Sequence, residues 1–456
     1  MNKAHFPALM LAWAGKALAA STPVPAFPDA EGYGAFAARG RGGTVLHVTS
    51  LKDDGPGSLR WALEQQTGPR IVIFDVAGTI TLTRQILVTS GRLTIAGQSA
   101  PGEGITLKGA RIRLKASDII IRGLHFRPGD GPIGQPFGER DGLMIGTTDF
   151  VLSNIMIDHN SFSWGIDENV SINGKVENIS FSHNIVAQGL SRNGHPKGEH
   201  SKGLLIANWQ GDEADARRIS VIKNLFADNI ERNPEVRAGH EVEIVNNLIA
   251  NHGRSGAAMA VGGGSLGSLT LRVMMIGNVM LRGPSTTGND PPIAVNAMTS
   301  ASRITLKDNI RLPHRSTPQD QRALAHGEAL QMPGLIVTQG GSPAHVTPLR
   351  SGAVKAYVLT HAGAMTASGR DRIDRQIVQQ VIDNNGRIID RPPVLSAVPD
   401  ASPPAPADTD RDGMPDWFEH RYGLNPASPD DQGEKNKDGF THIEVYLNGL
   451  IDGFKP

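Results

Sequence analysis

The chain has 456 residues and no cysteine, and its 45 Lys and Arg residues balance its 45 Asp and Glu residues. The missing cysteine excludes disulfides, thiolate metal sites and a cysteine nucleophile, and the zero net charge argues against a general nucleic-acid or membrane binder. Glycine is abundant, with 53 residues, whereas aromatic residues make up only 5%, which favours a turn-rich β protein.

The N-terminus has the pattern of a targeting segment. Lys3 precedes an apolar run at 6–15, and Ala17-Leu18-Ala19 offers a small-residue cleavage site. We therefore predict a signal peptide at residues 1–20 and an exported protein, secreted or periplasmic. A short N-terminal helix is the alternative. No apolar stretch is long enough to span a bilayer.

Short runs rich in Val, Ile and Phe, separated by Gly, Asp and Asn, dominate the chain from about residue 44. Six of them share a pattern in which a strand ends in asparagine, at Asn160, Asn184, Asn224, Asn247, Asn278 and Asn309. The copies are 23 to 40 residues apart, which fits one coil each of a parallel β-helix, an all-β fold. We expect the asparagines to adopt the left-handed conformation and to stack at one corner. A β-sandwich with Asn-rich turns is the alternative.

The chain changes character after the repeats. Apolar residues at 373, 377, 378 and 381 form a helical stripe within 370–382, which predicts a helix that caps the solenoid. A Pro-rich linker follows at 394–407 and separates a domain at 21–393 from a small acidic module at 408–456.

The acidic module begins with a complete D-x-D-x-D-G-x5-E pattern. Asp408, Asp410, Asp412 and Glu419 are spaced so that their carboxylates converge on one cation, and Gly413 permits the sharp turn. This pattern predicts a structural calcium site, with a solvated acidic turn as the alternative.

A second, degraded copy of this loop follows the first. Glu434, Asn436 and Asp438 keep the register, but the closing position is Val445, with Glu444 one residue early. The sequence leaves open whether this copy binds calcium.

The central region holds a constellation of charged residues. Asp141 precedes Ile-Asp-His at 157–159 and Asp167-Glu168, and the segments His-Ser-Lys-Gly-Leu-Leu at 200–205 and Arg-Asn-Pro-Glu-Val-Arg at 232–237 follow. On a β-helix these segments fall on successive coils about 4.8 Å apart, so their side chains lie next to one another. The spacing predicts a cleft where carboxylates face Lys and Arg.

These motifs, in this order, resemble polysaccharide lyase family 1, the pectate lyases. The opening segment at 27–34, the segment at 53–60 and Arg-Asp-Arg-Ile-Asp at 370–374 are also similar to bacterial members. The resemblance covers roughly residues 27–390, and a calcium module is a familiar appendage on such enzymes. It implies a right-handed parallel β-helix and calcium-dependent β-elimination of an anionic uronate polymer such as pectate, by a chain that we expect to be a monomer.

Residue roles follow from this resemblance. It implies that Arg232 is the base and that Lys202 and Arg237 bind substrate, with Lys202 as the alternative base. An arginine base needs a strongly cationic, metal-charged surrounding, because its ordinary pKa is above about 12.

The resemblance also implies that Asp141 and Asp167 bind catalytic calcium, with Glu168 as a neighbouring candidate. The chain has Ser171 where the family pattern has a further carboxylate. The composition of the calcium shell is therefore open, and Glu168 or substrate oxygens can complete it.

Other interpretations stay open from the sequence. Asp158 could be a structural hydrogen-bonding residue of the corner or a ligand, whereas His159 and His183 are expected to be structural. Arg232 and Arg237 could form surface ion pairs with Glu231 and Glu235. A polygalacturonase-type hydrolase needs closely placed aspartates that the central region lacks. A non-catalytic glycan-binding β-helix would keep the asparagines without needing the Lys and Arg set.

Overall fold

The computed structural model describes residues 24–208, 216–253, 257–263, 269–313, 320–339, 345–394, 403–429 and 432–454. The predicted signal peptide at 1–20 lies outside these residues, as does the part of the predicted linker at 395–402. None of the described helices is long and apolar enough to cross a membrane.

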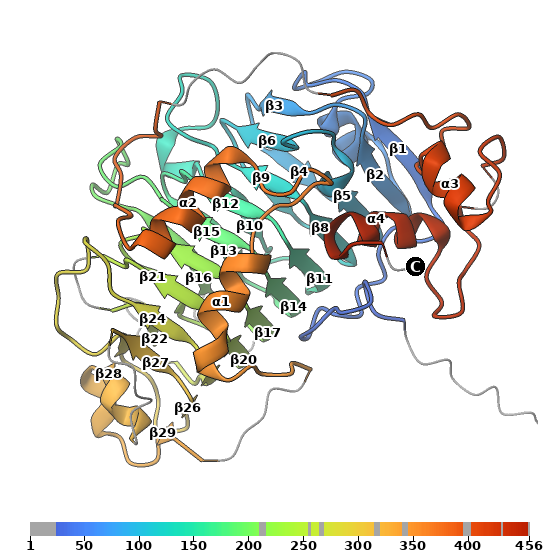
Figure 1. Cartoon of the computed structure of the whole chain (residues 1–456). Coiled ribbons are helices and arrows are strands. Elements are labelled where there is room, and N and C mark those ends of the chain that lie inside the picture. Colours follow the sequence, from blue (N-terminus) through green and yellow to red (C-terminus); the bar gives the residue numbers. More distant parts are fainter. Residues whose placement is uncertain are drawn as a thin grey trace, which may run out of the picture.

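Three parallel sheets stack coil upon coil to form a parallel β-helix (Figure 1), as predicted. The first sheet has eleven strands: β1 (Thr44–Val48), β2 (Arg70–Phe74), β5 (Leu93–Ala96), β8 (Ile119–Arg122), β11 (Leu152–Asp158), β14 (Val176–Ser182), β17 (Ala216–Ile222), β20 (His240–Val245), β23 (Arg272–Ile276), β26 (Arg303–Lys307) and β29 (Ile336–Val337).

The second and third sheets have nine strands each. The second sheet contains β3 (Gly78–Thr81), β6 (Ile105–Lys108), β9 (Leu124–Phe126), β12 (Ser161–Ser163), β15 (Ile185–Ala187), β18 (Leu225–Ala227), β21 (Leu248–Ala250), β24 (Val279–Leu281) and β27 (Ile310–Leu312). The third contains β4 (Ile86–Val88), β7 (Ile112–Leu114), β10 (Leu143–Ile145), β13 (Glu168–Asn173), β16 (Lys202–Ala207), β19 (Glu235–Val236), β22 (Met259–Val261), β25 (Ile293–Val295) and β28 (Ala325–His326).

The asparagine repeat forms a continuous ladder at the corner between the first and second sheets. The side-chain oxygen of each next asparagine accepts the backbone N–H of the one before, from Asn160 to Asn309, at 2.8–3.0 Å. The expected stacking is confirmed, but the expected left-handed conformation is wrong by one residue. Positive φ falls on the residue before each asparagine, for example His159 (49°), His183 (51°) and Lys223 (56°). The residue with positive φ makes the sharp bend of the corner. The asparagine that follows it can therefore form the ladder hydrogen bonds on the inside of the corner.

Helices α1 (Ser351–His361) and α2 (Arg372–Asp383) lie along the outside of the second sheet (Figure 1). The predicted stripe of α2, Ile373, Ile377, Val378 and Val381, is buried against this sheet. The helix is therefore confirmed, and it covers a side of the solenoid instead of its end. At the start of the solenoid, the short helix η1 (Trp61–Gln65) packs its buried residues into the core.

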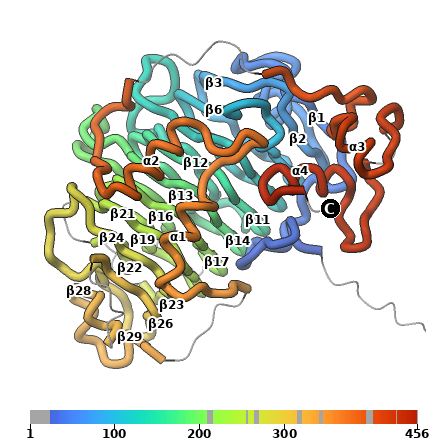
Figure 2. The backbone as a smooth tube through the Cα atoms, viewed as in Figure 1, coloured from blue at the N-terminus to red at the C-terminus, as the bar shows by residue number. Residues whose placement is uncertain are grey.

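The C-terminal segment is docked on the first coils (Figure 2). Helices α3 (Asp416–Tyr422) and α4 (His442–Asp452) pack Phe418 and Ile443 against Ile71 and Ile73 of β2. Glu444 binds the side chain of Arg41 at 2.6 Å and that of buried Arg39 as well. The acidic module therefore shares an apolar core with the solenoid.

Candidate active site

Carboxylates and cations from four coils meet where the strands of the third sheet begin. Glu168 pairs in register with Lys202, and Lys202 forms a bridge with Glu231 on the next coil. The backbone N–H of Glu168 donates to Asp141 one coil below, at 3.2 Å. The constellation expected from the sequence is therefore assembled at one edge of the sheet.

Three predicted metal ligands form one cluster. Asp141, Asp167 and Glu168 each place a carboxylate oxygen within 4.8 Å of the others. Burial raises the pKa of Asp141 to about 7, with the charge of Asp167 adding to this effect and that of Arg111 opposing it. Arg111 Nη1 lies 3.0 Å from Asp141 Oδ2, yet three carboxylates converge at this point, and carboxylate oxygens are the ligands that a hard divalent cation takes.

Ser171 lies on the outer face of β13, between Met144 and Leu205 of the neighbouring strands. Its hydroxyl lies 3.4 Å from Glu168 Oε2. A serine hydroxyl is a poorer ligand for a hard cation than a carboxylate, so this side of the cluster is short of one negative charge.

Arg232 projects into the cluster from the loop before β19. Its guanidinium contacts Glu168, and its Nε lies 2.9 Å from Glu235 Oε2. Burial lowers the pKa of Arg232 and the charge of Arg237 lowers it further, whereas Glu235 and Asp167 oppose the shift. The lowered pKa is the direction that a proton-accepting arginine requires.

The other two predicted substrate-binding cations flank Arg232. Lys202 Nζ lies 3.3 Å from Glu231 Oε1, and Arg237 Nε lies 2.8 Å from Glu235 Oε1. The ion pairs with glutamates that the sequence left open are thus present. Arg232 and Arg237 share Glu235, and Lys202 is paired with Glu231 on the next coil, so three cations gather near one end of the third sheet.

The backbone around Arg232 is held by close packing and by buried amides. Arg232 has a φ of 63°, and its carbonyl accepts the N–H of Leu204 at 2.6 Å. A Cβ on Gly203 would lie 2.4 Å from that carbonyl oxygen, so glycine is required there. Beneath it, Asn229 donates to Asn233 at 3.0 Å, which fixes the loop from inside. These amides were not predicted from the sequence.

Two histidines without a predicted role contact the cluster. Asp167 Oδ1 lies 3.6 Å from His195 Nε2 and 3.4 Å from His200 Nε2. Burial alone would raise the pKa of Asp167, but His200, His195 and Lys202 outweigh it and lower the pKa. His200 opens the segment at 200–205 that the sequence placed in the charged constellation, whereas His195 had no such signal.

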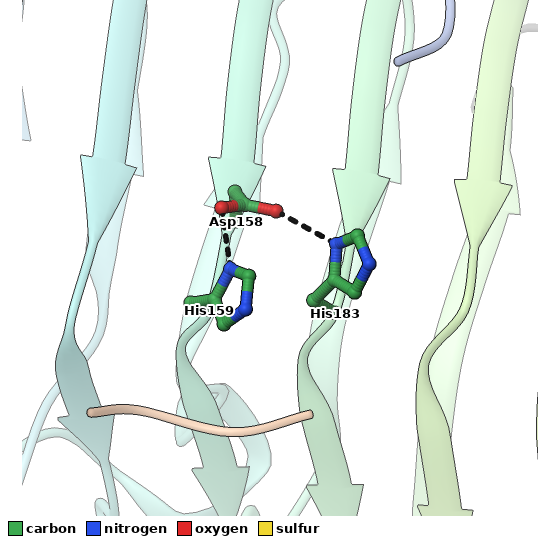
Figure 3. Close-up of side chains that lie close together, drawn as sticks. All are labelled: Asp158, His159 and His183. Atoms are coloured by element: carbon green, nitrogen blue, oxygen red, sulfur yellow. Dashed lines mark hydrogen bonds and ion pairs between the residues drawn. The ribbon is translucent and has the colours of Figure 1, made fainter. Parts of the chain in front are cut away.

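Asp158, His159 and His183 lie at another corner, beside the asparagine ladder (Figure 3). The buried Asp158 carboxylate binds His159 Nδ1 at 2.6 Å, His183 Nδ1 at 3.2 Å and Arg122 Nε at 2.9 Å. Burial would raise its pKa, but the charges of His159 and Arg122 and the imidazole hydrogen bonds hold it well below its usual range. Asp158 is therefore a saturated hydrogen-bonding centre of this corner.

The predicted calcium loop in the C-terminal segment has converging carboxylates. Asp408, Asp410 and Asp412 place oxygens within 4.8 Å of one another, and one buried oxygen of each lacks a hydrogen-bond donor. Burial raises the pKa of Asp412 to about 7, and the charges of Asp410, Glu419 and Asp408 add to it. Glu419 is fully buried, and Gly413 has a φ of 95°. These features fit a bound divalent cation.

The degraded second loop has no closing carboxylate in position. Glu444 belongs to the capping box of α4 with Thr441 and binds two arginines of the solenoid. Asn436 accepts the N–H groups of Asp438 and Phe440, both at 3.0 Å. Its side chain stabilises the turn.

Comparisons with known proteins agree with this architecture. No protein-family model matches the chain. It is 34% identical over 437 residues to "Probable pectate lyase C" of Aspergillus flavus, covering 93% of this chain and 94% of that protein, and 34% identical over 446 residues to the protein of the same name from Emericella nidulans, covering 94% of each.

Solved structures share the fold at low sequence identity. A structure titled "Pectate lyase bound to hexasaccharide" has a TM-score of 0.50 and 17% identity, covering 76% of this chain and 99% of that one. Another, from a study of the anti β-elimination mechanism of pectate lyase, has a TM-score of 0.51 and 17% identity, covering 74% and 97%. The fold is thus the right-handed parallel β-helix that these lyase structures have. The chain belongs to the pectate lyase family.

Proposed function

We propose that this chain is a calcium-dependent lyase that cleaves pectate or polygalacturonate by β-elimination and releases 4,5-unsaturated uronates. The observation that carries the proposal is Arg232, a partly buried arginine with a lowered pKa that contacts Glu168 and shares Glu235 with Arg237. The cations favour free carboxylates over methyl esters as substrate groups.

The side chains fit the steps of an elimination. Lys202 and Arg237 bind and orient uronate carboxylates, and their charge stabilises the enolate-like anion that forms when the C5 proton leaves. Arg232 in its neutral form collects that proton as the C4–O bond breaks and the C4–C5 double bond forms. The departing oxygen takes a proton from solvent and becomes the hydroxyl of the new reducing end, and Arg232 returns its proton to solvent. A calcium ion held by Asp141, Asp167 and Glu168 would supply further Lewis-acid stabilisation of the carboxylate.

The cleanest test of the base replaces Arg232 without straining its backbone. Asparagine tolerates positive φ, so Arg232→Asn keeps the loop geometry. We expect turnover on polygalacturonate, followed by ultraviolet absorbance of the new double bond, to fall about 10²- to 10⁴-fold. The matched control is Arg218→Asn, because Arg218 also has positive φ (53°) but lies on the first sheet. Control-like activity in Arg232→Asn would reject the assignment.

We also propose that residues 408–419 bind a structural calcium ion through Asp408, Asp410, Asp412 and Glu419. Support comes from the buried oxygens of Asp408, Asp410 and Asp412 that lack donors and from the raised pKa of Asp412. Because this loop shares a core with β2, the ion would stabilise the first coils as well as the loop itself.

The remaining proposals concern organisation and location. Residues 1–20 would direct export, residues 21–393 would form the lyase domain, and residues 408–456 would form the calcium module after the linker at 394–407. The protein would act outside the cytoplasm, as a monomer, on a polymeric substrate. Mass determination of the mature protein after expression in its host tests removal of the first 20 residues.

A further inference from the structure

The outer face of the third sheet carries a cation next to the candidate site. The strands of this sheet follow one another along the axis of the solenoid (Figure 1). On β7, Ile112 and Leu114 belong to the core, so Arg113 between them points to the outer face. Arg113 is in register with Met144 of β10, which is in register with Ser171 of β13. Two strand spacings, about 10 Å, therefore separate Arg113 from the serine beside the carboxylate cluster.

The side chain of Arg113 is unpaired within the part of the chain that the structure describes. Its Nε is buried without an acceptor, and its guanidinium forms no hydrogen bond or ion pair with any described residue. The flanking cations are paired, since Arg111 Nη1 lies 3.0 Å from Asp141 Oδ2. Lys115 Nζ lies 3.0 Å from Asp149 Oδ2. A partly buried guanidinium without a partner is costly, and an anion bound there would remove the cost.

The residues of the proposed site lie on successive coils of this sheet. Asp141 precedes β10, Glu168 begins β13, Lys202 begins β16 and Arg237 follows β19. A polymer that contacts both the carboxylate cluster and these cations therefore lies across the coils, along the axis of the solenoid. From β10, the next strand in the direction away from Lys202 is β7. A longer chain that continues in that direction reaches Arg113.

The register places Arg113 on the line of such a chain. Its row continues through Leu205 to Glu235, which contacts both Arg232 and Arg237. Arg113 is therefore aligned with the acid that positions the proposed base, three coils further along the same face.

We propose that Arg113 forms a further subsite that binds a carboxylate of the uronate polymer, on the side of the carboxylate cluster opposite Lys202. The inference rests on the proposed function, because it takes the same polymer as ligand. A guanidinium binds a carboxylate through two parallel hydrogen bonds, so this subsite favours a free acid over a methyl ester. It adds affinity only when an oligouronate is long enough to extend from the carboxylate cluster to β7.

The test is the binding of oligogalacturonates of increasing length to the full chain in the presence of calcium. All proteins carry Arg232→Asn, so that the ligand stays intact, and calorimetry gives the affinity from the trisaccharide to the octasaccharide. We expect the affinity of the parent to rise with chain length. Arg113→Gln should lose that rise and bind the octasaccharide about 10- to 100-fold more weakly. The matched control is Arg272→Gln, because Arg272 is an exposed strand arginine of the first sheet.

A conservative variant separates a binding role from a structural one. Arg113→Lys keeps the charge but lacks the planar fork, so its rise with chain length should lie between those of the parent and Arg113→Gln. This variant also keeps the test decisive if Arg113→Gln does not fold. A rise as large as in the parent would overturn the subsite, and so would an equal loss at every chain length.

The outcomes also distinguish the subsite from the proposed function. If octasaccharide binding depends on Arg113 but the wild type forms no unsaturated product, the proposed function fails and the subsite stands. If the wild type cleaves polygalacturonate and substitution of Arg113 leaves the chain-length dependence unchanged, the subsite fails and the proposed function stands.

Discussion

Removing one amide from the asparagine ladder should destabilise the whole solenoid. Asn224 is fully buried, and its Nδ2 donates to the carbonyl of Phe181 and to Asn247 Oδ1, both at 2.9 Å. Its Oδ1 accepts from the N–H of Asn184 at 2.8 Å and from Asn184 Nδ2 at 3.1 Å. Asn224→Ala therefore removes four hydrogen bonds within a dry corner.

The magnitude follows from what each partner loses. Asn247 Oδ1 keeps the backbone N–H at position 224, and Asn184 Nδ2 keeps the carbonyl of Ile157. The Asn184 N–H loses its side-chain acceptor, at about 1–3 kcal/mol, and the carbonyl of Phe181, which belongs to the paired strand β14, loses a side-chain donor, at about 0.5–1.5 kcal/mol. We therefore expect a loss of roughly 1.5–4.5 kcal/mol in the free energy of unfolding.

Urea unfolding at constant pH, followed by circular dichroism, measures this loss. The control is Asn289→Ala, because Asn289 is exposed and its substitution should change stability by less than about 0.5 kcal/mol. If Asn224→Ala were as stable as the control, the ladder would not be a source of stability. That result would refute the cost assigned to the orphaned buried groups.

Three further outcomes follow from other sites. Lys202→Met should lower kcat/KM on polygalacturonate about 10- to 100-fold, since a charged hydrogen bond contributes about 1.5–3 kcal/mol; an unchanged value would contradict its substrate role. Asp412→Asn should abolish the calcium-dependent rise in Tm, which corresponds to about 2.7 kcal/mol at a hundredfold excess over Kd; a persisting rise would contradict the ion assignment. Burial raises the pKa of Asp228 to about 7, above the ordinary value of 3.8. The native state therefore holds a proton that the unfolded chain has lost, and stability should fall by up to about 1.4 kcal/mol per pH unit between about pH 4 and 7. Asp228→Asn should flatten this slope in chemical unfolding at several pH values, and an unaltered slope would show that Asp228 is not its source.

The fold was predictable because the same sequence pattern recurs in successive coils. Each coil contributes a short apolar strand and an asparagine, so six local patterns reinforce one another, from Asn160 to Asn309. The prediction placed the left-handed residue one position too late. The sequence shows the repeated asparagine but does not show which residue of the corner has the positive φ. The residue that bends varies in type, as His159, Lys223 and Gly277 show.

The central residues of the candidate site were also predictable, because the register of the parallel strands places them next to one another. Once Asp141, Glu168 and Lys202 lie on successive coils, the strand spacing brings their side chains together without further information. The roles of these residues came from family resemblance and not from the spacing.

The remaining features depend on loops and terminal segments whose sequences carry no repeating pattern. His195 lies on a long connection whose path back to Asp167 no strand pattern specifies. The docking of the C-terminal segment depends on Glu444 meeting Arg39 and Arg41 more than 400 residues earlier in the chain. Such contacts are set by tertiary packing, so they appear only in the structure.

The chemical identity of the product distinguishes elimination from every alternative. The wild-type protein is incubated with polygalacturonate, with calcium and after chelation, and the products are analysed by ultraviolet absorbance and mass spectrometry. We predict oligouronates with a C4–C5 double bond, lighter by one water than hydrolysis products, whose release stops on chelation and resumes when calcium is restored. Saturated oligouronates, or an intact polymer in the presence of calcium, would contradict the proposed lyase activity.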